Sequence, residues 1–145
     1  MAQAFYSMVL DHSAEAVWQV IRSFGAYAWS GVVADTVIED DKAGDQVGAV
    51  RRVRVGDTII RQHLLAHSDL ERFYSYAFLE PAPVRNYQAT IRVIPVVETD
   101  QALVCWSARF DCAPEEIGQW THHFVQNGFA VWLSALRRVM AETDS

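Results

Sequence analysis

The feature that most constrains this chain is a long run of residues with a hydrophobic period of two. From Val32 to Asp111, apolar and polar residues alternate, and β-branched and aromatic residues are frequent. Such alternation is typical of strands that have one buried face. No helix-length pattern interrupts the run, so we expect the strands to form an antiparallel meander. The expected strands are residues 32–39, 48–55, 58–67, 71–80, 85–97 and 101–111.

The segment before this run predicts one more strand and a short helix. Residues 5–10 are apolar and bounded, which indicates a first strand. Ser13 can cap the following helix by accepting a hydrogen bond from a free backbone N–H, and Gly25 is expected to end it. The piece from Tyr27 to Trp29 is either one more helical turn or a loop. The apolar stripe of the helix consists of Ala14, Val17, Trp18, Ile21 and Phe24.

The C-terminal segment predicts one long helix. Pro114 suits the first helical position, and Glu115 and Glu116 favour the positive end of the helix dipole. The pattern continues to about Glu142, which corresponds to roughly 40 Å of helix. A helix of this length needs a large apolar partner, and a curved seven-stranded sheet is the candidate that the chain offers. On a regular helical wheel one broad face carries Ile117, Thr121, Phe124, Val125, Gly128, Trp132, Ala135 and Val139.

Length and composition narrow the class of protein. The chain has 145 residues, of which 51% are hydrophobic and 21% charged, so we expect a single folded domain over residues 1–145. A net charge of −6 argues against a nucleic-acid-binding surface. No apolar run approaches the roughly 18 residues of a membrane span, and the N-terminus lacks the pattern of a signal peptide.

The two cysteines predict free thiols. Cys105 and Cys112 are seven residues apart on an expected strand and its exit, which places them on opposite faces. Their separation along a strand would be roughly 23 Å, much more than the about 7 Å that a disulfide allows. Free thiols indicate a reducing compartment, with the cytoplasm as the default.

Four short motifs and the order of the elements resemble the Bet v 1-like helix-grip superfamily (SRPBCC), which includes START domains, and in particular its polyketide cyclase/dehydrase-like branch. The resemblance implies an α+β helix-grip fold: a seven-stranded curved antiparallel sheet wraps around a long C-terminal helix, and one or two short helices follow the first strand. It also implies a ligand cavity between the sheet and the helix. Gln62 departs from the family pattern, which usually has Glu there, and this removes a carboxylate from the cavity. The motifs are Ile60-Arg61-Gln62-His63-Leu64-Leu65, Arg72-Phe73-Tyr74-Ser75-Tyr76, Pro83-Val84-Arg85-Asn86-Tyr87 and Val104-Cys105-Trp106-Ser107.

Strand alternation predicts which side chains face the helix. Residues two apart on a strand share a face, so an inward Gln62 leaves Arg61 and His63 facing solvent. Arg52 and Arg54 are expected on the same outer face as Arg61. The expected inward residues are Ile60, Gln62 and Leu64; Tyr74, Tyr76 and Phe78; Tyr87, Ala89 and Ile91; and Val104, Trp106, Ala108 and Phe110.

Several of these residues are candidates for binding a ligand. Arg51 has the parity to meet Gln62 across a hairpin, and at a cavity mouth it would suit a carboxylate, phenolate or enolate. An equally weighted alternative for Arg51 is a salt bridge at the rim. For the tyrosines we favour a role as polar points of an apolar pocket, since a buried hydroxyl needs a partner. The candidate set is Arg51, Gln62, Tyr74, Tyr76, Tyr87, Trp106, Phe124, Gly128 and Trp132.

The main alternative is a filled core. In this interpretation the inward rings pack on the helix residues Phe124, Phe129 and Trp132, and no cavity is left. For Leu64, Phe78 and Phe110 this simple packing role is the favoured interpretation.

The histidines do not predict a metal site, and we expect no metal and no cofactor. His63 and His67 would lie about 13 Å apart on a strand, too far to share an ion. His122 and His123 point about 100° apart on a helix and have no third ligand at a useful spacing. Sequence motifs of hydrolases, zinc proteases and nucleotide-binding loops are absent from the chain.

The leading hypothesis is a protein that binds a small hydrophobic ligand, of aromatic, polyketide or lipid-like type, between the sheet and the C-terminal helix. If it is an enzyme, the resemblance implies a cyclase or dehydrase, in which Tyr76, Tyr87 and Arg51 polarise carbonyls or hold an enolate. The alternatives are a non-catalytic carrier or sensor, and an interaction module with a filled core.

Overall fold

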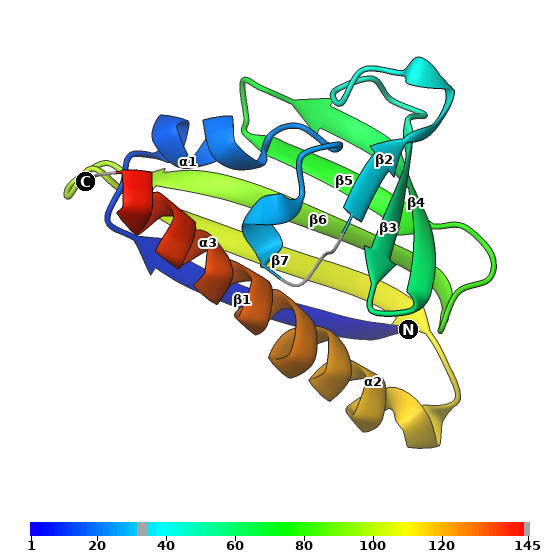
Figure 1. Cartoon of the computed structure of the whole chain (residues 1–145). Coiled ribbons are helices and arrows are strands. Elements are labelled where there is room, and N and C mark those ends of the chain that lie inside the picture. Colours follow the sequence, from blue (N-terminus) through cyan, green and yellow to red (C-terminus); the bar gives the residue numbers. More distant parts are fainter. Residues whose placement is uncertain (32–34, 144–145) are drawn as a thin grey trace.

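The computed structural model of the protein describes residues 1–31 and 35–143, and it has one curved sheet and one long C-terminal helix (Figure 1). The strands form in the places that the alternating pattern indicates, with ends that differ by a few residues. Of the expected strand 32–39, residues 32–34 lie outside the described residues. The elements are β1 (Ala2–Leu10), α1 (Ala14–Ile21), the 3-10 turn η1 (Ala28–Ser30), β2 (Asp35–Ile38), the turn η2 (Glu39–Asp41), β3 (Val50–Val55), β4 (Thr58–Ser68), β5 (Phe73–Phe78), β6 (Arg85–Val96), β7 (Gln101–Asp111), the turn η3 (Pro114–Glu116), α2 (Ile117–Phe124), the π-helical turn η4 (Val125–Phe129) and α3 (Ala130–Thr143).

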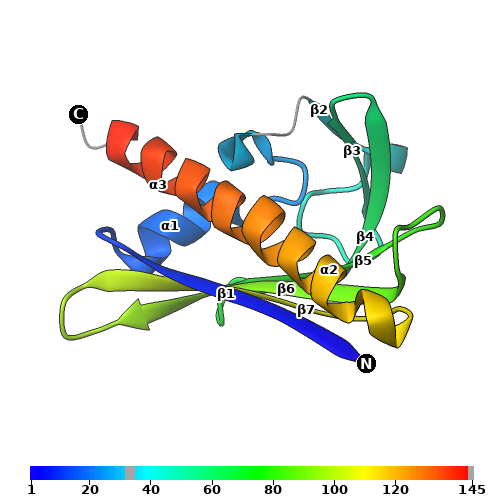
Figure 2. The same ribbon diagram turned by 90° about the horizontal axis from the view of Figure 1, so that it is seen from below.

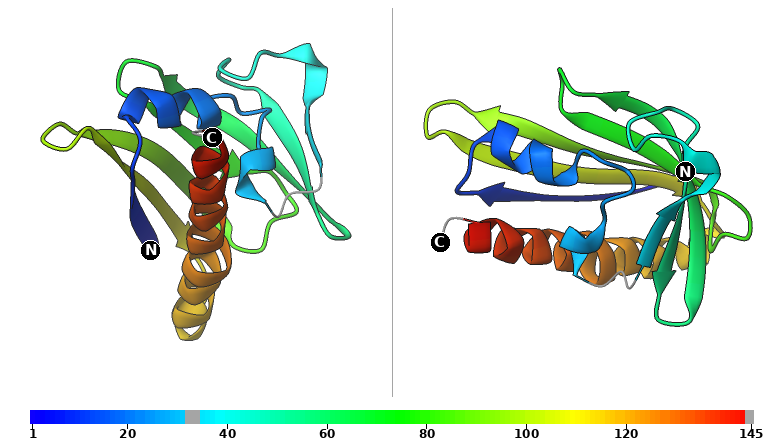
Figure 3. Two further views of the ribbon diagram at one scale, coloured as in Figure 1. Left: turned by 60° about the vertical axis from the view of Figure 1, so that its left-hand side comes forward. Right: turned by 45° about the horizontal axis from the view of Figure 1, so that its top comes forward.

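The sheet has seven antiparallel strands in the order β1-β7-β6-β5-β4-β3-β2. The expected meander is confirmed, and β1 joins its far edge by pairing with β7 from Ala2 opposite Phe110 to Leu10 opposite Ala102. The sheet bends so that β2, β3 and β4 turn up beside the long helix, which crosses the concave side (Figures 2 and 3). The helix-grip fold predicted from the sequence is therefore confirmed.

Two local features set the register of the central strands. Gly56 lies in the two-residue turn between β3 and β4 with φ of 61°, a backbone conformation that an L side chain rarely adopts. The second feature is a bulge between Leu64 and Ala66 on β4. Beyond the bulge His67 pairs with Tyr74 and lies against the Trp18 ring, with 5.5 Å between ring centroids. The bulge thus turns His67 toward the interior.

Helix α1 is shorter than the sequence pattern indicates. The Ser13 hydroxyl accepts a hydrogen bond from the Ala16 backbone N–H at 3.1 Å, as expected for its cap. The helix ends at Ile21 and not at Gly25, so the predicted C-terminal cap at Gly25 is wrong. Phe24 is nevertheless fully buried, because the chain beyond the helix folds back against the sheet and places its ring on Tyr74. The following segment contains η1, a single 3-10 turn.

The long helix contains a single π-helical turn at its centre, which adds one residue to the helix. In η4 the backbone N–H of Ala130 bonds to the carbonyl of Val125, which is the five-residue spacing of a π-helix. A regular wheel predicts an inward stripe through Trp132, Ala135 and Val139; Ala135 is buried, and Trp132 and Val139 are half-buried against the core. The extra residue rotates the second half of the helix, so the most deeply buried positions there lie one residue beyond those that a regular wheel gives. Phe129, at the end of the π turn, and Leu133 and Leu136 beyond it have no exposed surface, and Met140 and Ala135 are also buried.

Candidate functional site

An open groove lies at one end of the sheet, with a volume of about 670 Å³. The start of β4 forms one wall through Ile59 and Ile60, and the turn between β5 and β6 forms another through Pro83. The third wall is the N-terminal half of the long helix, which contributes Trp120 and Asn127. The groove is also lined by His122 and His123, both exposed. Ile60 is half-buried and lies two residues before Gln62, so the groove borders the inner face of the sheet.

Arg51 lies in the interior and not at a rim. Its side chain is 0% exposed, and its Nε donates to Gln62 Oε1 at 2.7 Å, which is the contact across the hairpin that strand parity predicts. Its Nη1 donates to the carbonyl oxygen of Phe24 and to the Tyr74 hydroxyl, both at 3.4 Å. Because these described partners are all neutral and the side chain is buried, the alternative of a rim salt bridge is wrong.

Aromatic rings surround the Arg51 guanidinium. Its central carbon lies 4.1 Å from the ring centroid of Phe24, 4.0 Å from that of Tyr27 and 5.0 Å from that of Tyr76. Ring faces attract cations, and the attraction is stronger where water is excluded. These contacts partly offset the cost of burying the charge.

The inner rings extend from Arg51 to the helix. Trp106 on β7 stacks on Phe129 with 5.0 Å between ring centroids, and its Nε1 donates to the Tyr76 hydroxyl at 3.1 Å. Tyr87 contacts Phe124 at 5.0 Å between centroids. Burial raises the pKa of Tyr76 to about 12, against the opposing effect of the Arg51 charge. At neutral pH this hydroxyl is therefore protonated.

A group of buried polar atoms in this region makes no hydrogen bond within the described residues. We name Tyr27, Trp29, Ser30, Arg51 and Trp132 the interior polar cluster; its unpartnered atoms are the two hydroxyls, the two indole Nε1 atoms and Arg51 Nη2. Ring contacts connect most of its members: the Tyr27 centroid lies 5.2 Å from that of Trp29 and 6.0 Å from that of Trp132. Burial also raises the pKa of Tyr27 well above its usual value. Buried polar groups almost always have partners, so we treat the interior polar cluster as the candidate place for water or another molecule.

Close packing of η1 on the long helix positions part of this cluster. Gly31 ends η1 with φ of 77°, and a Cβ on it would lie 2.9 Å from the Cβ of Ala135. The absence of a side chain at Gly31 lets η1, with Trp29 and Ser30, lie directly on α3. At Gly128 a Cβ would make only an ordinary contact with the Trp132 ring, at 3.4 Å, so the packing there does not require glycine.

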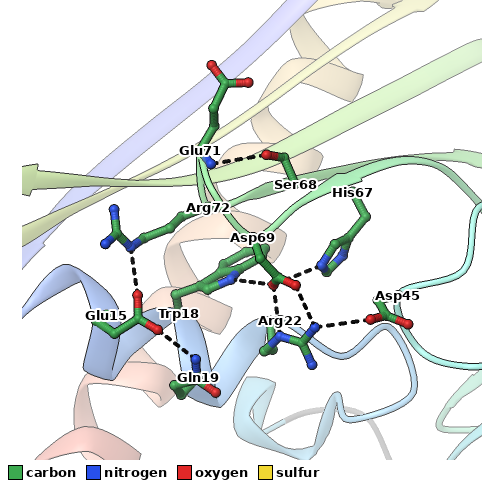
Figure 4. A network of polar contacts seen from close by, with 10 residues as sticks. All are labelled: Glu15, Trp18, Gln19, Arg22, Asp45, His67, Ser68, Asp69, Glu71 and Arg72. Carbon is green, nitrogen blue, oxygen red and sulfur yellow. Dashed lines mark hydrogen bonds and ion pairs between the residues drawn. The ribbon is translucent and has the colours of Figure 1, made fainter.

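A second set of polar residues connects α1 to the turn between β4 and β5 through hydrogen bonds (Figure 4). Asp69 accepts hydrogen bonds from Trp18 Nε1 and from Arg22 Nε and Nη2, each at 2.9 Å. His67 contacts the same carboxylate at 3.0 Å, and Arg22 also pairs with Asp45 at 3.2 Å. The Arg22 and Trp18 donors hold the pKa of Asp69 well below its usual range.

This second group also contains atoms that could ligate a metal. One ligand atom from each of Asp45, His67 and Asp69 lies within 4.8 Å of the others. The Arg22 guanidinium binds both carboxylates and supplies the positive charge that a metal ion would bring. We therefore interpret the group as a structural salt-bridge network.

The comparisons with known proteins agree with this architecture. The profile of the family described as "Polyketide cyclase / dehydrase and lipid transport" matches residues 1–141. The chain belongs to this family. No curated protein matches it in sequence.

Solved structures place this cyclase/dehydrase family member among helix-grip proteins. It is similar to the protein XoxI from Bacillus cereus, with a TM-score of 0.86 and 28% identity over 100% of this chain and 99% of that one. A Thermobifida fusca protein has a TM-score of 0.86 and 26% identity, over 94% of this chain and 91% of that one. Norcoclaurine synthase from Thalictrum flavum, solved with dopamine and hydroxybenzaldehyde, shares the fold with a TM-score of 0.77 and 17% identity, over 99% and 88% of the two chains. These structural comparisons show the helix-grip fold.

The candidate side chains of this family member are connected from Arg51 to the helix. Trp106 and Tyr87 both contact Tyr76, and they lead to Trp132 and Phe124 respectively. The side chains of Arg51, Gln62, Tyr74 and Tyr76 form one connected group, while Tyr87 and Phe124 lie toward the groove end of the helix. Trp132 is half-buried and Gly128 is buried in the π turn. The filled-core role favoured for some residues fits Leu64 and Phe110, both 1% exposed, and Phe78, which stacks on Tyr87. Binding of a ligand by the candidate set stays a prediction.

Sequence reasoning missed several other residues at the site. Tyr27, Trp29 and Ser30 lie on a segment that could be either a helical turn or a loop, and Trp120 lies outside the predicted apolar stripe. Their aromatic character was the available signal, because a connecting segment with two rings must bury them somewhere. The prediction for the outer face is confirmed for Arg52, Arg54 and Arg61, which are exposed. His63 is only half-buried and its Nδ1 is covered, so it does not face solvent fully.

No helix among residues 1–31 and 35–143 combines the length and the apolar character that crossing a membrane requires. Both cysteines are free, as expected.

Proposed function

We propose that the protein binds a small hydrophobic, aromatic or polyketide-like molecule in its interior, between the concave face of the sheet and the long helix. The family description, which names polyketide cyclases, dehydrases and lipid transport, supports this assignment. Norcoclaurine synthase, which has the same fold, was solved with two small aromatic molecules. The rings around Arg51 and Trp106 provide an apolar surface that suits such a molecule.

The observation that carries the proposal is the interior polar cluster. Five buried polar atoms without a hydrogen-bond partner are costly unless something completes their hydrogen bonds. A filled core would leave these costs uncompensated, and this favours a bound ligand over the alternative of an interaction module with solid packing.

The groove between β4, the β5–β6 turn and the helix is the proposed mouth of the site. Ile60 lines it, and the next inward residue on the same strand is Gln62, which contacts Arg51. A molecule entering beside Ile60 and Asn127 would therefore meet the polar interior after passing along one strand face.

The proposal is tested by blocking this mouth. Asn127→Trp adds a large ring in the groove, and Gln126→Trp is the matched control because Gln126 is exposed on the same helical turn outside the groove. We expect native mass spectrometry to recover a small apolar molecule from the wild-type protein and from Gln126→Trp but not from Asn127→Trp. The neutral probe 2-naphthamide should likewise bind the first two more tightly. If this probe binds all three proteins equally, the proposed mouth is wrong.

Catalysis of a cyclisation is a second candidate function. The hydroxyls of Tyr27 and Tyr76 belong to rings that flank the Arg51 guanidinium, and the raised pKa of Tyr76, about 12, keeps its proton available at neutral pH. Such donors can stabilise negative charge that develops on a carbonyl oxygen when a carbon next to it is deprotonated. Tyr76→Phe should then reduce turnover of a bound polyketide much more than its affinity. Equal effects on turnover and affinity would favour the carrier function.

A further inference from the structure

The unpartnered atoms of the interior polar cluster are mainly hydrogen-bond donors. Arg51 Nη2 and the indole nitrogens of Trp29 and Trp132 can only donate. The hydroxyls of Tyr27 and Ser30 can donate or accept. The cluster has no unpartnered atom that can only accept. A ligand that completes these hydrogen bonds must therefore be rich in acceptors near the cluster.

The buried positive charge of Arg51 favours an acceptor that is negatively charged. The Arg51 guanidinium keeps its proton under all ordinary conditions, and its side chain has no exposed surface. Its described hydrogen-bond partners are an amide oxygen, a backbone carbonyl and a hydroxyl, all without charge. The nearby ring faces of Phe24 and Tyr27 attract the cation but place no acceptor on Nη2. A buried cation without a counter-ion is strongly favoured to bind an anion.

We propose that the ligand is an aromatic acid whose carboxylate lies against Arg51 Nη2 and the Tyr27 hydroxyl. This inference rests on the proposed function, because it describes the polar end of the molecule bound in the same interior. A carboxylate has several acceptor sites in one plane, which suits the planar guanidinium. The rings of Tyr27, Trp29 and Trp132 favour a flat aromatic body next to that carboxylate.

The test compares acids with their uncharged analogues of the same shape. The probes are benzoic, 2-naphthoic and anthracene-2-carboxylic acids, each paired with its primary amide, titrated into the protein by calorimetry at neutral pH. We expect the best-fitting acid to bind about ten- to hundredfold more tightly than its amide, the usual range for one charge-assisted hydrogen bond. The same acid should also raise the Tm of the wild-type protein more than the amide does.

Two arginine variants assign the preference to a residue. Arg51→Met should abolish the preference for the acid and leave the amide affinity nearly unchanged. Arg54→Met is the matched control, because Arg54 is exposed on the same strand, and it should keep the preference. If Arg51→Met does not fold, Arg51→Lys takes its place, and its single point charge should retain only part of the preference.

The outcomes separate this inference from the proposed function. Equal affinities of the wild-type protein for acid and amide would overturn the carboxylate assignment and leave the ligand-binding proposal standing. A preference that survives in Arg51→Met would also overturn it. If no probe pair binds, the inference and the proposed function fail together.

Discussion

Replacing Arg51 and Gln62 together by Met and Leu is expected to stabilise the protein. The two side chains form a buried polar pair inside an apolar interior, with Arg51 at 0% and Gln62 at 7% exposure. Burying a guanidinium costs several kcal/mol. The ring contacts and the hydrogen bond to Gln62 recover part of this cost, at roughly 1–2 kcal/mol each. Substituting buried charged groups by apolar ones of similar volume usually gains about 1–4 kcal/mol.

From these terms we expect the double variant to gain about 1–3 kcal/mol in free energy of unfolding. For a chain of this length the corresponding rise in Tm is roughly 3–10 °C. Arg51→Met alone should be nearly neutral, because it leaves the amide of Gln62 buried without its partner, at a cost of about 1–3 kcal/mol. The difference in free energy of unfolding between the single and the double variant measures the cost of burying the Gln62 amide without its partner.

The measurement is urea unfolding followed by tryptophan fluorescence, since the chain has five tryptophans. Refolded protein is used so that a ligand acquired in the cell does not add to the stability of the wild type. A double variant at least 1 kcal/mol less stable than the wild type would refute the reasoning, because it would mean that the ring contacts more than compensate the buried charge.

Two further predictions concern packing and pH. Phe129→Ala removes a fully buried ring that stacks on Trp106, so we expect a loss of about 3–5 kcal/mol in urea unfolding, and a loss below about 1 kcal/mol would contradict this packing. The lowered pKa of Asp69 stabilises the fold above the unfolded-state pKa of about 4, and this stabilisation is lost as the pH falls toward the folded-state value. Because the carboxylate is half exposed, the loss for Asp69→Asn at neutral pH should be only about 1 kcal/mol. Between pH 6 and pH 3 the wild type should lose more stability than Asp69→Asn, and parallel pH profiles would speak against the network around Arg22.

The sheet could be predicted from the sequence because burial of one face imposes alternation directly on the residues. The inward orientation of Gln62 and Trp106 follows from that rule, and so does the contact between Arg51 and Gln62. The depth of Arg51 does not follow, since alternation tells the face of a residue and not its distance from the edge of a curved sheet. Curvature and the position of Phe24 decide that depth, and both depend on contacts distant in the chain.

Irregular features explain the remaining differences. The bulge near Leu64 and the π turn at residues 125–129 each add one residue to a regular element. Neither changes the composition of its segment, so a periodic pattern continued through it is displaced by one residue on the far side. On β4 this displacement turns His67 inward, and on the helix it moves the most buried positions to Leu133, Leu136 and Met140. The network around Asp69 joins residues from α1, a loop and a hairpin, and only the folded chain brings them together.

The π turn has a consequence for comparing this chain with its relatives. A related protein with a regular helix at this point would have one residue fewer between Phe124 and Met140 for the same set of inward positions. An alignment without a gap would then match each residue in the second half of the helix to a neighbour about 100° away around the helix axis. Site residues transferred from such a relative would all be displaced by one position, although the structures superimpose. Structure-based alignment across residues 125–129 is therefore needed before any residue of α3 is assigned a role by homology.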